Sequence, residues 1–284
     1  MIDYKKFVEN SRKWLEKYIT SNHLQSLVIG VSGGIDSTVS CAIASPVCNK
    51  LNIPLIGRSL PSNTNKDNEN ITANLVGNAF CSDYKVVSIE NSFANIFADL
   101  VLNEGHITPL QEGNIKARLR MIYLRHLASI HKGVVLDNDN FTEWNLGFWT
   151  VGGDSPMDIN LGLHYLWKTE VYELANFLLE EQNQSDKYQA LLASIHLTPT
   201  DGNGVSNSDC EQFGLDNYGQ VDDVLKTMYY RNPLNDSTKE CNNYTRLIDS
   251  YNEQGVDKVM TLHQNTEYKR KPAPIIPSKE ELEL

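Results

Sequence analysis

Hydrophobic residues along this chain occur in short runs, several of which end at glycine or at a polar turn. Residues 27–31 form an apolar run rich in β-branched side chains, which predicts a buried strand. A Ser-Gly-Gly turn at 32–34 ends this run, and the small and apolar residues of 37–44 predict a helix packed closely on a sheet. Similar runs predict further strands at 53–60, 84–89 and 133–136.

In the segments between and before these strands, apolar residues recur at the spacing of a helix. This spacing predicts an amphipathic helix over 1–20, a helix over 69–81 and a long helix over 113–130. The apolar face expected for the long helix carries Ile115, Leu119, Ile122 and Ala128. Strands and helices that alternate in this way are typical of an α/β protein with a doubly wound parallel sheet flanked by helices, which binds ligands at the carboxyl ends of its strands.

No internal repeat and no clear domain boundary interrupts this pattern. We therefore expect a single domain over 1–284, with a flexible C-terminal segment at about 271–284.

The composition narrows the class of protein. The net charge of −11 over 284 residues argues against a nucleic-acid-binding protein, which needs a basic surface. No apolar run approaches the roughly 18 residues of a membrane span. The five cysteines form no Cys-x-x-Cys pair, which is typical of reduced thiols. We expect a cytoplasmic protein without a membrane or nucleic-acid partner.

The strand, glycine turn and helix start within 26–41 form a candidate anion site. Glycines let the backbone approach a ligand, and a helix N-terminus offers N–H groups and partial positive charge. Asp36 lies in the first helical turn, where a carboxylate is suited to hold Mg²⁺ that carries phosphates. The segment contains neither G-x-x-x-x-G-K-[ST] nor G-x-G-x-x-G, which excludes the P-loop and the dinucleotide fingerprint.

This segment resembles the Ser-Gly-Gly-x-Asp-Ser loop of the N-type ATP pyrophosphatases, whose Rossmann-like fold is that of the adenine nucleotide alpha-hydrolases. In that superfamily the loop holds the β- and γ-phosphates of ATP while a nucleophile attacks the α-phosphorus. The resemblance implies that ATP contacts Gly30, Val31, Ser32, Gly33, Gly34, Ile35, Asp36 and Ser37.

A second segment is similar to one family within that superfamily. Gly113-Asn-Ile-Lys-Ala-Arg-Leu-Arg-Met resembles the Gly-Asn-x-Lys-Ala-Arg-x-Arg-Met of NAD synthetases. Residues 137–150 are similar to the family's Gly-Thr-x-x-x-x-Glu-x-x-x-Gly-Phe-x-Thr, and 168–171 to its Lys-Thr-x-Val. Residues 199–214 and 266–272 resemble its Pro-Thr-Ala-Asp…Asp-Glu-x-x-Leu-Gly and His-Lys-Arg-x-x-Pro segments. We expect no attached glutaminase domain, so the resemblance is to the ammonia-dependent form.

The resemblance implies the reaction of this family. The nicotinate carboxylate of deamido-NAD attacks the α-phosphorus of ATP, pyrophosphate leaves, and ammonia then displaces AMP to form the amide of NAD. Asp36 and Glu143 would hold Mg²⁺ and, with Lys168, would be the catalytic residues. ATP would also contact Asn138, Lys168 and Thr200, the last from the polar loop 198–209, which we expect to act as a lid.

The other substrate has its own expected contacts. Deamido-NAD would contact Arg118, Asp158, Tyr268 and Lys269. Arg118 and Arg120 are two apart on a helix and point in different directions, so at most one faces a given site. The resemblance further implies a homodimer with the helix near 115–130 at its interface and the second substrate bound across it.

Several positions depart from the family pattern, mostly in the dinucleotide half. Asn138 stands in place of a threonine, Val151 of a lysine, Cys210 of a glutamate and Tyr268 of a histidine. Two alternatives therefore stay open. One is a tRNA-modifying adenylating enzyme of the same superfamily, which the acidic charge disfavours. The other is a nucleotide-binding protein that has lost turnover, which the presence of both Asp36 and Glu143 disfavours.

Overall fold

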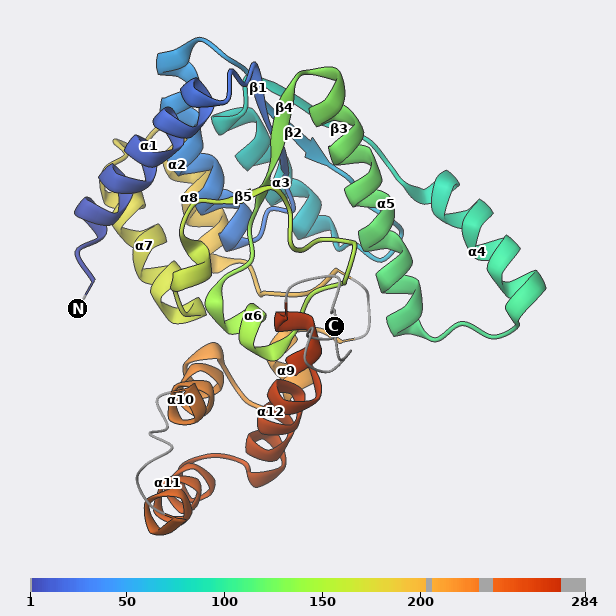
Figure 1. Cartoon of the computed structure of the whole chain (residues 1–284), viewed down its shortest axis with the longest axis vertical. Coiled ribbons are helices and arrows are strands. Elements are labelled where there is room, and N and C mark those ends of the chain that lie inside the picture. The colour runs from blue at the N-terminus through green and yellow to red at the C-terminus, as the bar shows by residue number, and fades with distance from the viewer. Residues whose placement is uncertain (1, 203–205, 230–236, 272–284) are drawn as a thin grey trace, which may run out of the picture.

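The computed structural model describes residues 2–202, 206–229 and 237–271, with the backbone alone at 237–242 (Figure 1). In these residues the chain forms one parallel sheet with strand order β3-β2-β1-β4-β5. The strands are β1 (Ser26–Gly30), β2 (Leu55–Ser59), β3 (Asp83–Val86), β4 (Gly133–Asp137) and β5 (Ile159–Asn160). The predicted doubly wound α/β fold is confirmed.

Helices cover both faces of the sheet because successive strand residues point to opposite sides. Leu27, Ile29 and Leu55 face a large core, whereas Val28 and Ile56 face the other side. On the large-core side lie α1 (Tyr4–Ser21), α2 (Ile35–Leu51), α3 (Asp67–Phe80), α7 (Lys168–Glu180) and α8 (Asp186–His196). The opposite side is covered by α5 (Pro109–Ile130), on which α4 (Glu90–Glu104) packs.

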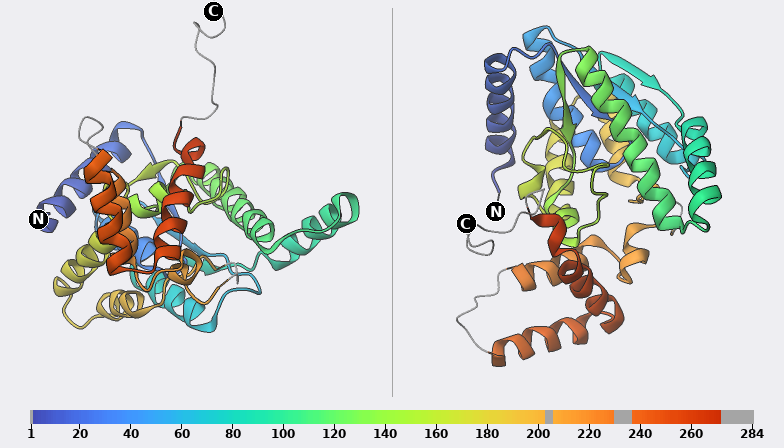
Figure 2. Two further views of the ribbon diagram at one scale, coloured as in Figure 1. Left: turned by 90° about the horizontal axis from the view of Figure 1, so that it is seen from below. Right: turned by 45° about the vertical axis from the view of Figure 1, so that its right-hand side comes forward.

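The C-terminal helices build a second core beside the carboxyl ends of the strands (Figure 2). Phe213, Val221 and Val256 are fully buried in it, together with Leu146 and Trp167 from the sheet-bearing part. Its helices are α6 (Phe141–Leu146), α9 (Asp209–Phe213), α10 (Tyr218–Tyr229), α11 (Ser237–Ser250) and α12 (Glu253–Asn265). Two 3-10 turns, η1 (Leu163–Tyr165) and η2 (Glu267–Arg270), complete the described elements.

The predicted helix over 1–20 is α1, and Asp3 caps it by accepting a hydrogen bond from the backbone N–H of Lys6. The helix after the glycine turn is longer than expected, because α2 continues past Pro46 to Leu51. The long helix also begins earlier, at Pro109, where Thr108 and Gln111 form a capping box. The third strand is shorter than predicted and ends at Val86.

The apolar face predicted for the long helix is partly wrong. Ile122 is 59% exposed, and Ile115 and Leu119 are only half-buried. The C-terminal half of α5 packs on the sheet, while its N-terminal half faces the polar turn after β2, so small residues and one lysine are buried there. The buried residues of α5 are Gly113, Lys116, Ala117, Leu124 and Ala128.

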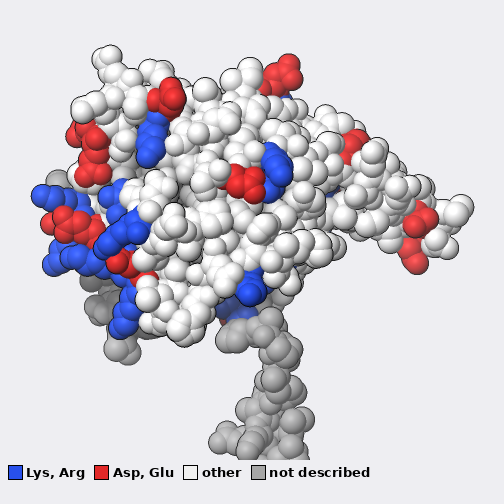
Figure 3. All heavy atoms as spheres, turned by 90° about the horizontal axis from the view of Figure 1, so that it is seen from above, with Lys and Arg blue, Asp and Glu red and all other residues white. Residues whose placement is uncertain are grey.

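The remaining expectations concern surface and chemistry. None of the helices in the described residues is both long and apolar enough to cross a membrane. On the face seen from above, basic side chains lie among acidic ones (Figure 3). Cys41, Cys48, Cys81 and Cys210 are free thiols. The expected flexible segment lies, apart from Lys271, outside the described residues.

Candidate functional site

The glycine turn after β1 packs directly against α3. Gly33 has φ = +85°, and a Cβ at this position would lie 2.6 Å from the backbone nitrogen of Ala73 and 2.8 Å from the carbonyl oxygen of Glu69. Both the backbone conformation and the close approach exclude a side chain. The glycine therefore lets the turn lie flat against α3 and lead directly into α2, whose N-terminus is a place where a phosphate can bind.

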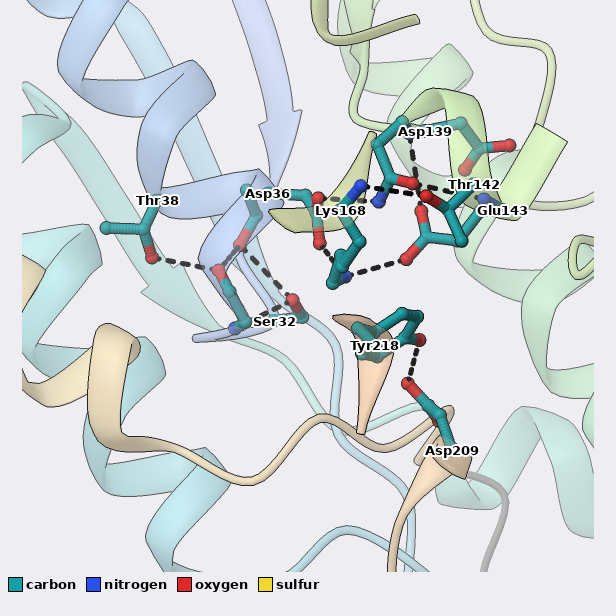
Figure 4. Close-up of polar contacts among 12 residues, drawn as sticks. Ser32, Asp36, Thr38, Asp139, Thr142, Glu143, Lys168, Asp209 and Tyr218 are labelled. Atoms are coloured by element: carbon teal, nitrogen blue, oxygen red, sulfur yellow. Dashed lines mark hydrogen bonds and ion pairs between the residues drawn. The ribbon is translucent and has the colours of Figure 1, made fainter. Parts of the chain in front are cut away.

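Side chains of the same segment hold the turn in shape (Figure 4). Ser32 Oγ accepts a hydrogen bond from the backbone N–H of Gly34 and lies 3.2 Å from Ser37 Oγ. Thr38 Oγ1 donates to the carbonyl of Gly34 at 2.9 Å. A loop preorganised in this way at a helix N-terminus is suited to bind the phosphates of a nucleotide.

Asp36, Glu143 and Lys168 meet beside this turn (Figure 4). Lys168 Nζ lies 2.5 Å from Asp36 Oδ2 and 2.8 Å from Glu143 Oε1, and all three side chains are nearly buried. They come from the first turn of α2, from α6 and from the start of α7. The structure therefore brings the three predicted catalytic residues together.

Asn140 joins the two loops that carry the carboxylates. It begins α6 as a capping residue, since its Oδ1 accepts from the backbone N–H of Glu143 at 3.0 Å. Its Nδ2 donates to Asp36 Oδ1 at 2.8 Å. Because β1 and β4 are neighbours at the point where the strand order reverses, this contact spans the crevice where doubly wound folds bind ligands.

Lys168 is fixed through its backbone by a buried hydrogen-bond network. Its N–H donates to Thr142 Oγ1 at 2.8 Å, and Asp222 accepts from both Thr142 Oγ1 and Thr169 N–H. Asp222 is buried on α10, so the C-terminal helices position the start of α7. Movement of the Lys168 ammonium therefore has to come from its own side-chain torsions.

Asp209 and Tyr218 lie on the other side of Lys168 (Figure 4). The Tyr218 ring centroid is 5.1 Å from Lys168 Nζ, and the Tyr218 hydroxyl donates to Asp209 Oδ2 at 2.9 Å. Asp209 is 4% exposed, and its Oδ1 has no hydrogen-bond partner in the described residues. A buried carboxylate oxygen without a partner is unusual in a folded protein, which makes Asp209 a candidate functional residue.

Negative charge dominates this cluster. Burial and the charge of Asp36 raise the pKa of Glu143 to about 7, and burial raises the pKa of Asp209 to about 6. Burial lowers the pKa of Lys168, but the charges of Asp36 and Glu143 outweigh it and hold that pKa well above its ordinary value. One ammonium therefore offsets only part of the charge of three carboxyl groups.

The donor set fits a hard divalent cation shared with a substrate. Among the described residues no three His, Cys, Asp or Glu side chains are grouped so as to hold a metal ion by themselves. Mg²⁺ in nucleotide-binding proteins is commonly bound by one or two carboxylates and takes its other ligands from phosphates and water. Asp36 and Glu143 could supply those two carboxylates.

Of two further residues predicted to contact ATP, Thr200 is linked to the turn through Glu69 and Asn138 follows the neighbouring strand. Thr200 Oγ1 donates to Glu69 Oε1 at 2.5 Å, and the carbonyl of Glu69 is the group that approaches Gly33. Asn138 follows β4, and its buried Oδ1 has no partner in the described part of the chain. The predicted loop 198–209 is described except for 203–205.

The residues predicted to contact deamido-NAD are more scattered. Arg118 Nε donates to the carbonyl of Val151 at 3.3 Å, and Lys269 Nζ donates to the carbonyl of Gly147 at 2.6 Å, so both border the segment 147–151. Tyr268 is exposed. Asp158, however, is paired with Arg125 at 2.5 Å and accepts from the N–H of Val135.

Arg118 and Arg120 diverge as predicted. Arg120 turns inward, and its Nε donates to the carbonyl of Leu60 at 2.9 Å. The sequence reasoning did not assign Asn140, Asp209 or Tyr218 to the site. Asp209 lies in a segment that resembles the family pattern, which was the available signal; Asn140 and Tyr218 carried none.

Comparison with known proteins agrees with this geometry. Residues 7–273 match the family described as NAD synthase. The chain belongs to the NAD synthase family. It is 28% identical over 272 residues to the NH3-dependent NAD+ synthetase of Thermoplasma volcanium, covering 95% of this chain and 97% of that protein. It is 30% identical to the Pyrococcus furiosus protein of the same name, covering 94% of each chain.

Solved structures show the same fold at lower identity. The NMN synthetase of Francisella tularensis superposes with a TM-score of 0.76 at 24% identity, covering 98% of this chain and 100% of that one. The NH3-dependent NAD synthetase of Campylobacter jejuni gives 0.69 at 19% identity, covering 97% and 100%. The NAD synthase fold thus extends over nearly the whole chain.

Proposed function

We propose that this chain catalyses the ATP-dependent amidation of deamido-NAD with ammonia, giving NAD, AMP and pyrophosphate. The observation that carries the proposal is the meeting of Asp36, Glu143 and Lys168 beside the glycine turn, in a chain of the NAD synthase family. Curated relatives that cover almost the entire chain are named NH3-dependent NAD+ synthetases.

The reacting carboxylate of deamido-NAD is already a nucleophile, so the protein has to position phosphates and neutralise charge. Asp36 and Glu143 would hold Mg²⁺, which withdraws charge from the ATP phosphates when bound. The turn at 32–34 orients the leaving pyrophosphate, and Lys168 supplies a positive charge next to it. Thr200 and Asn138 complete the proposed ATP contacts.

For the dinucleotide we propose contacts with Arg118, Tyr268 and Lys269. The exposed Arg118 guanidinium suits a carboxylate or phosphate through its planar geometry. Lys269 Nζ donates a hydrogen bond to the carbonyl of Gly147 and lies over the Trp149 ring, 5.2 Å from its centroid. Asp158 would contact this substrate only by sharing its carboxylate with Arg125.

A homodimer through α4 and α5 is part of the proposal. The helix α4 projects from the body of the molecule and packs on α5, which covers the sheet (Figure 1), and the projecting arm carries few charged side chains (Figure 3). Exposed large apolar residues on these helices are Ile96, Leu100, Val101, Leu102, Leu110, Ile122 and Ile130. Such a patch on a soluble chain is typical of a protein–protein interface.

The test is an assay with ATP, Mg²⁺, ammonium and deamido-NAD that measures NAD and AMP separately. We expect one NAD per AMP, and a loss of at least about a hundredfold in rate for Asp36→Asn, because a metal-binding carboxylate is removed. Asp249→Asn, which neutralises an exposed carboxylate, serves as the control.

Nicotinate mononucleotide is assayed in parallel as a second acid substrate. Amidation of the mononucleotide alone would contradict the proposed dinucleotide substrate while leaving the chemistry intact. ATP binding without formation of AMP from either acid would contradict the proposed reaction.

A further inference from the structure

The ammonium of Lys168 lies where a cation shared by Asp36 and Glu143 would have to lie. The other oxygen of each carboxylate faces Asn140: Asp36 Oδ1 is 2.8 Å from its Nδ2, and Glu143 Oε2 is 3.4 Å from its backbone nitrogen. The other two oxygens, Asp36 Oδ2 and Glu143 Oε1, both contact Lys168 Nζ, so a cation held by the two carboxylates through these oxygens would meet the ammonium.

A divalent cation and this ammonium exclude each other at that place. Mg²⁺ binds oxygen at about 2.1 Å, within the space that the ammonium takes between the two carboxylates. Two positive charges so close in a buried site would repel strongly. The binding of a metal by Asp36 and Glu143 therefore requires that the Lys168 side chain move.

The possible directions of that movement are limited. The backbone of Lys168 is held by Thr142 and the side chain is buried, so the ammonium can only turn within the same pocket. The Tyr218 ring, whose face attracts a cation, is 5.1 Å from Nζ. Beyond the ring lies Asp209, with one oxygen held by the Tyr218 hydroxyl and the other buried without a partner in the described residues.

We propose that Lys168 has two positions, one on Asp36 and Glu143 and one on Asp209 over the Tyr218 ring, and that metal binding moves it from the first to the second. This rests on the proposed metal-binding role of Asp36 and Glu143. Asp209 and Tyr218 are positioning residues, which keep the displaced ammonium paired inside the site. The unpartnered Asp209 oxygen is explained by this second position.

The inference is tested by measuring Mn²⁺ binding to the full chain, without nucleotide, by electron paramagnetic resonance. Lys168→Met removes the competing ammonium, so the Kd for Mn²⁺ should fall about tenfold. Asp209→Asn removes the second position, so the Kd should rise about tenfold. In the Lys168→Met background, Asp209→Asn should change the Kd less than about twofold, because the two effects act through one side chain.

Tyr218→Phe gives a second variant in case Asp209→Asn lowers the folded fraction. It retains the ring but removes the hydroxyl that holds the Asp209 carboxylate in place. It should therefore weaken Mn²⁺ binding in the chain that contains Lys168, and have no effect when combined with Lys168→Met. Asp216→Asn, which removes an exposed charge near the same helices, is the control for a general loss of negative charge. Circular dichroism checks that each variant is folded.

An equal weakening by Asp209→Asn in both backgrounds would overturn the inference, since Asp209 would then act on the metal directly. So would Mn²⁺ binding that is insensitive to Asp36→Asn. The titration needs neither deamido-NAD nor ammonia, so it is independent of the proposed reaction. If the effects of Lys168→Met and Asp209→Asn on the Kd for Mn²⁺ are non-additive but the chain forms no NAD, the two lysine positions are supported and only the proposed function is contradicted.

Discussion

Asn140 donates a hydrogen bond from Nδ2 to Oδ1 of Asp36 at 2.8 Å, although the two residues are 104 positions apart in the chain. The contact fixes the carboxylate on α2 relative to the loop after β4. Because Asn140 also caps the helix that carries Glu143, one side chain sets the geometry of both acidic residues.

This double role predicts different results for two substitutions of Asn140. Asn140→Ser retains a capping hydroxyl and loses only the contact with Asp36, so we expect kcat/KM for ATP to fall about tenfold with little change in stability. Asn140→Ala also loses the cap and should destabilise the fold by about 1 kcal/mol. Initial rates and urea unfolding measure the two effects. Equal stability of both variants would contradict the capping role.

The close approach at Gly33 predicts a steric effect beyond that of its backbone angle. Gly105 has nearly the same φ, +86°, but an added Cβ there would meet no atom within 4 Å. Gly105→Ala should therefore cost about 1–3 kcal/mol from backbone strain alone. Gly33→Ala should cost about 1–3 kcal/mol more, because its methyl group overlaps the backbone of α3. Urea unfolding of both variants provides the comparison, and similar losses would argue against the overlap.

The raised pKa of Glu143, about 7, predicts how stability changes with pH. An unfolded glutamate titrates near 4.3, so between these values the folded chain binds more protons than the unfolded chain. Glu143 therefore makes the free energy of unfolding fall as pH rises from about 4.5 to about 7. Relative to Glu143→Gln, the chain should lose about 2–3 kcal/mol over this window.

Urea unfolding of the two chains at pH 5 and pH 8 measures this change. A difference between them that is the same at both pH values would show that Glu143 titrates normally.

The proposed dimer predicts that one exposed isoleucine is sensitive to charge and another is not. Ile122 on α5 and Ile71 on α3 are 59% and 60% exposed. Ile122→Glu places a charge in the proposed interface and should convert the dimer to a monomer, because burying an unpaired charge is costly. Ile71→Glu should leave the mass unchanged. Light scattering distinguishes the two, and a wild-type monomer would refute the dimer.

The local features of the candidate phosphate site could be read from the sequence. An apolar run, two glycines and small helical residues specify a strand, a turn and a helix through contacts between near neighbours, such as those of Ser32 and Thr38 with Gly34. The resemblance added Glu143 and Lys168, and the structure places both against Asp36. The order of strands and helices likewise predicted the parallel sheet.

Which residues of α5 are buried could not be predicted from the sequence. Its spacing indicated an apolar face at Ile122, but only the packing of α5 against the sheet and the turn after β2 decides that Leu124 and Lys116 are buried. Periodicity gives a direction around a helix, whereas the neighbour that covers each turn is set by tertiary structure.

The sequence by itself determined the conformation of the glycine turn and the polar groups it carries, because a few adjacent residues encode them. The tertiary structure alone decided which distant groups surround that turn. It paired Asp158 with Arg125 and placed Asn140 on Asp36 and the Asp209–Tyr218 pair beside Lys168. Such contacts depend on strand order and on the docking of the C-terminal helices, which bring residues together that no local pattern relates.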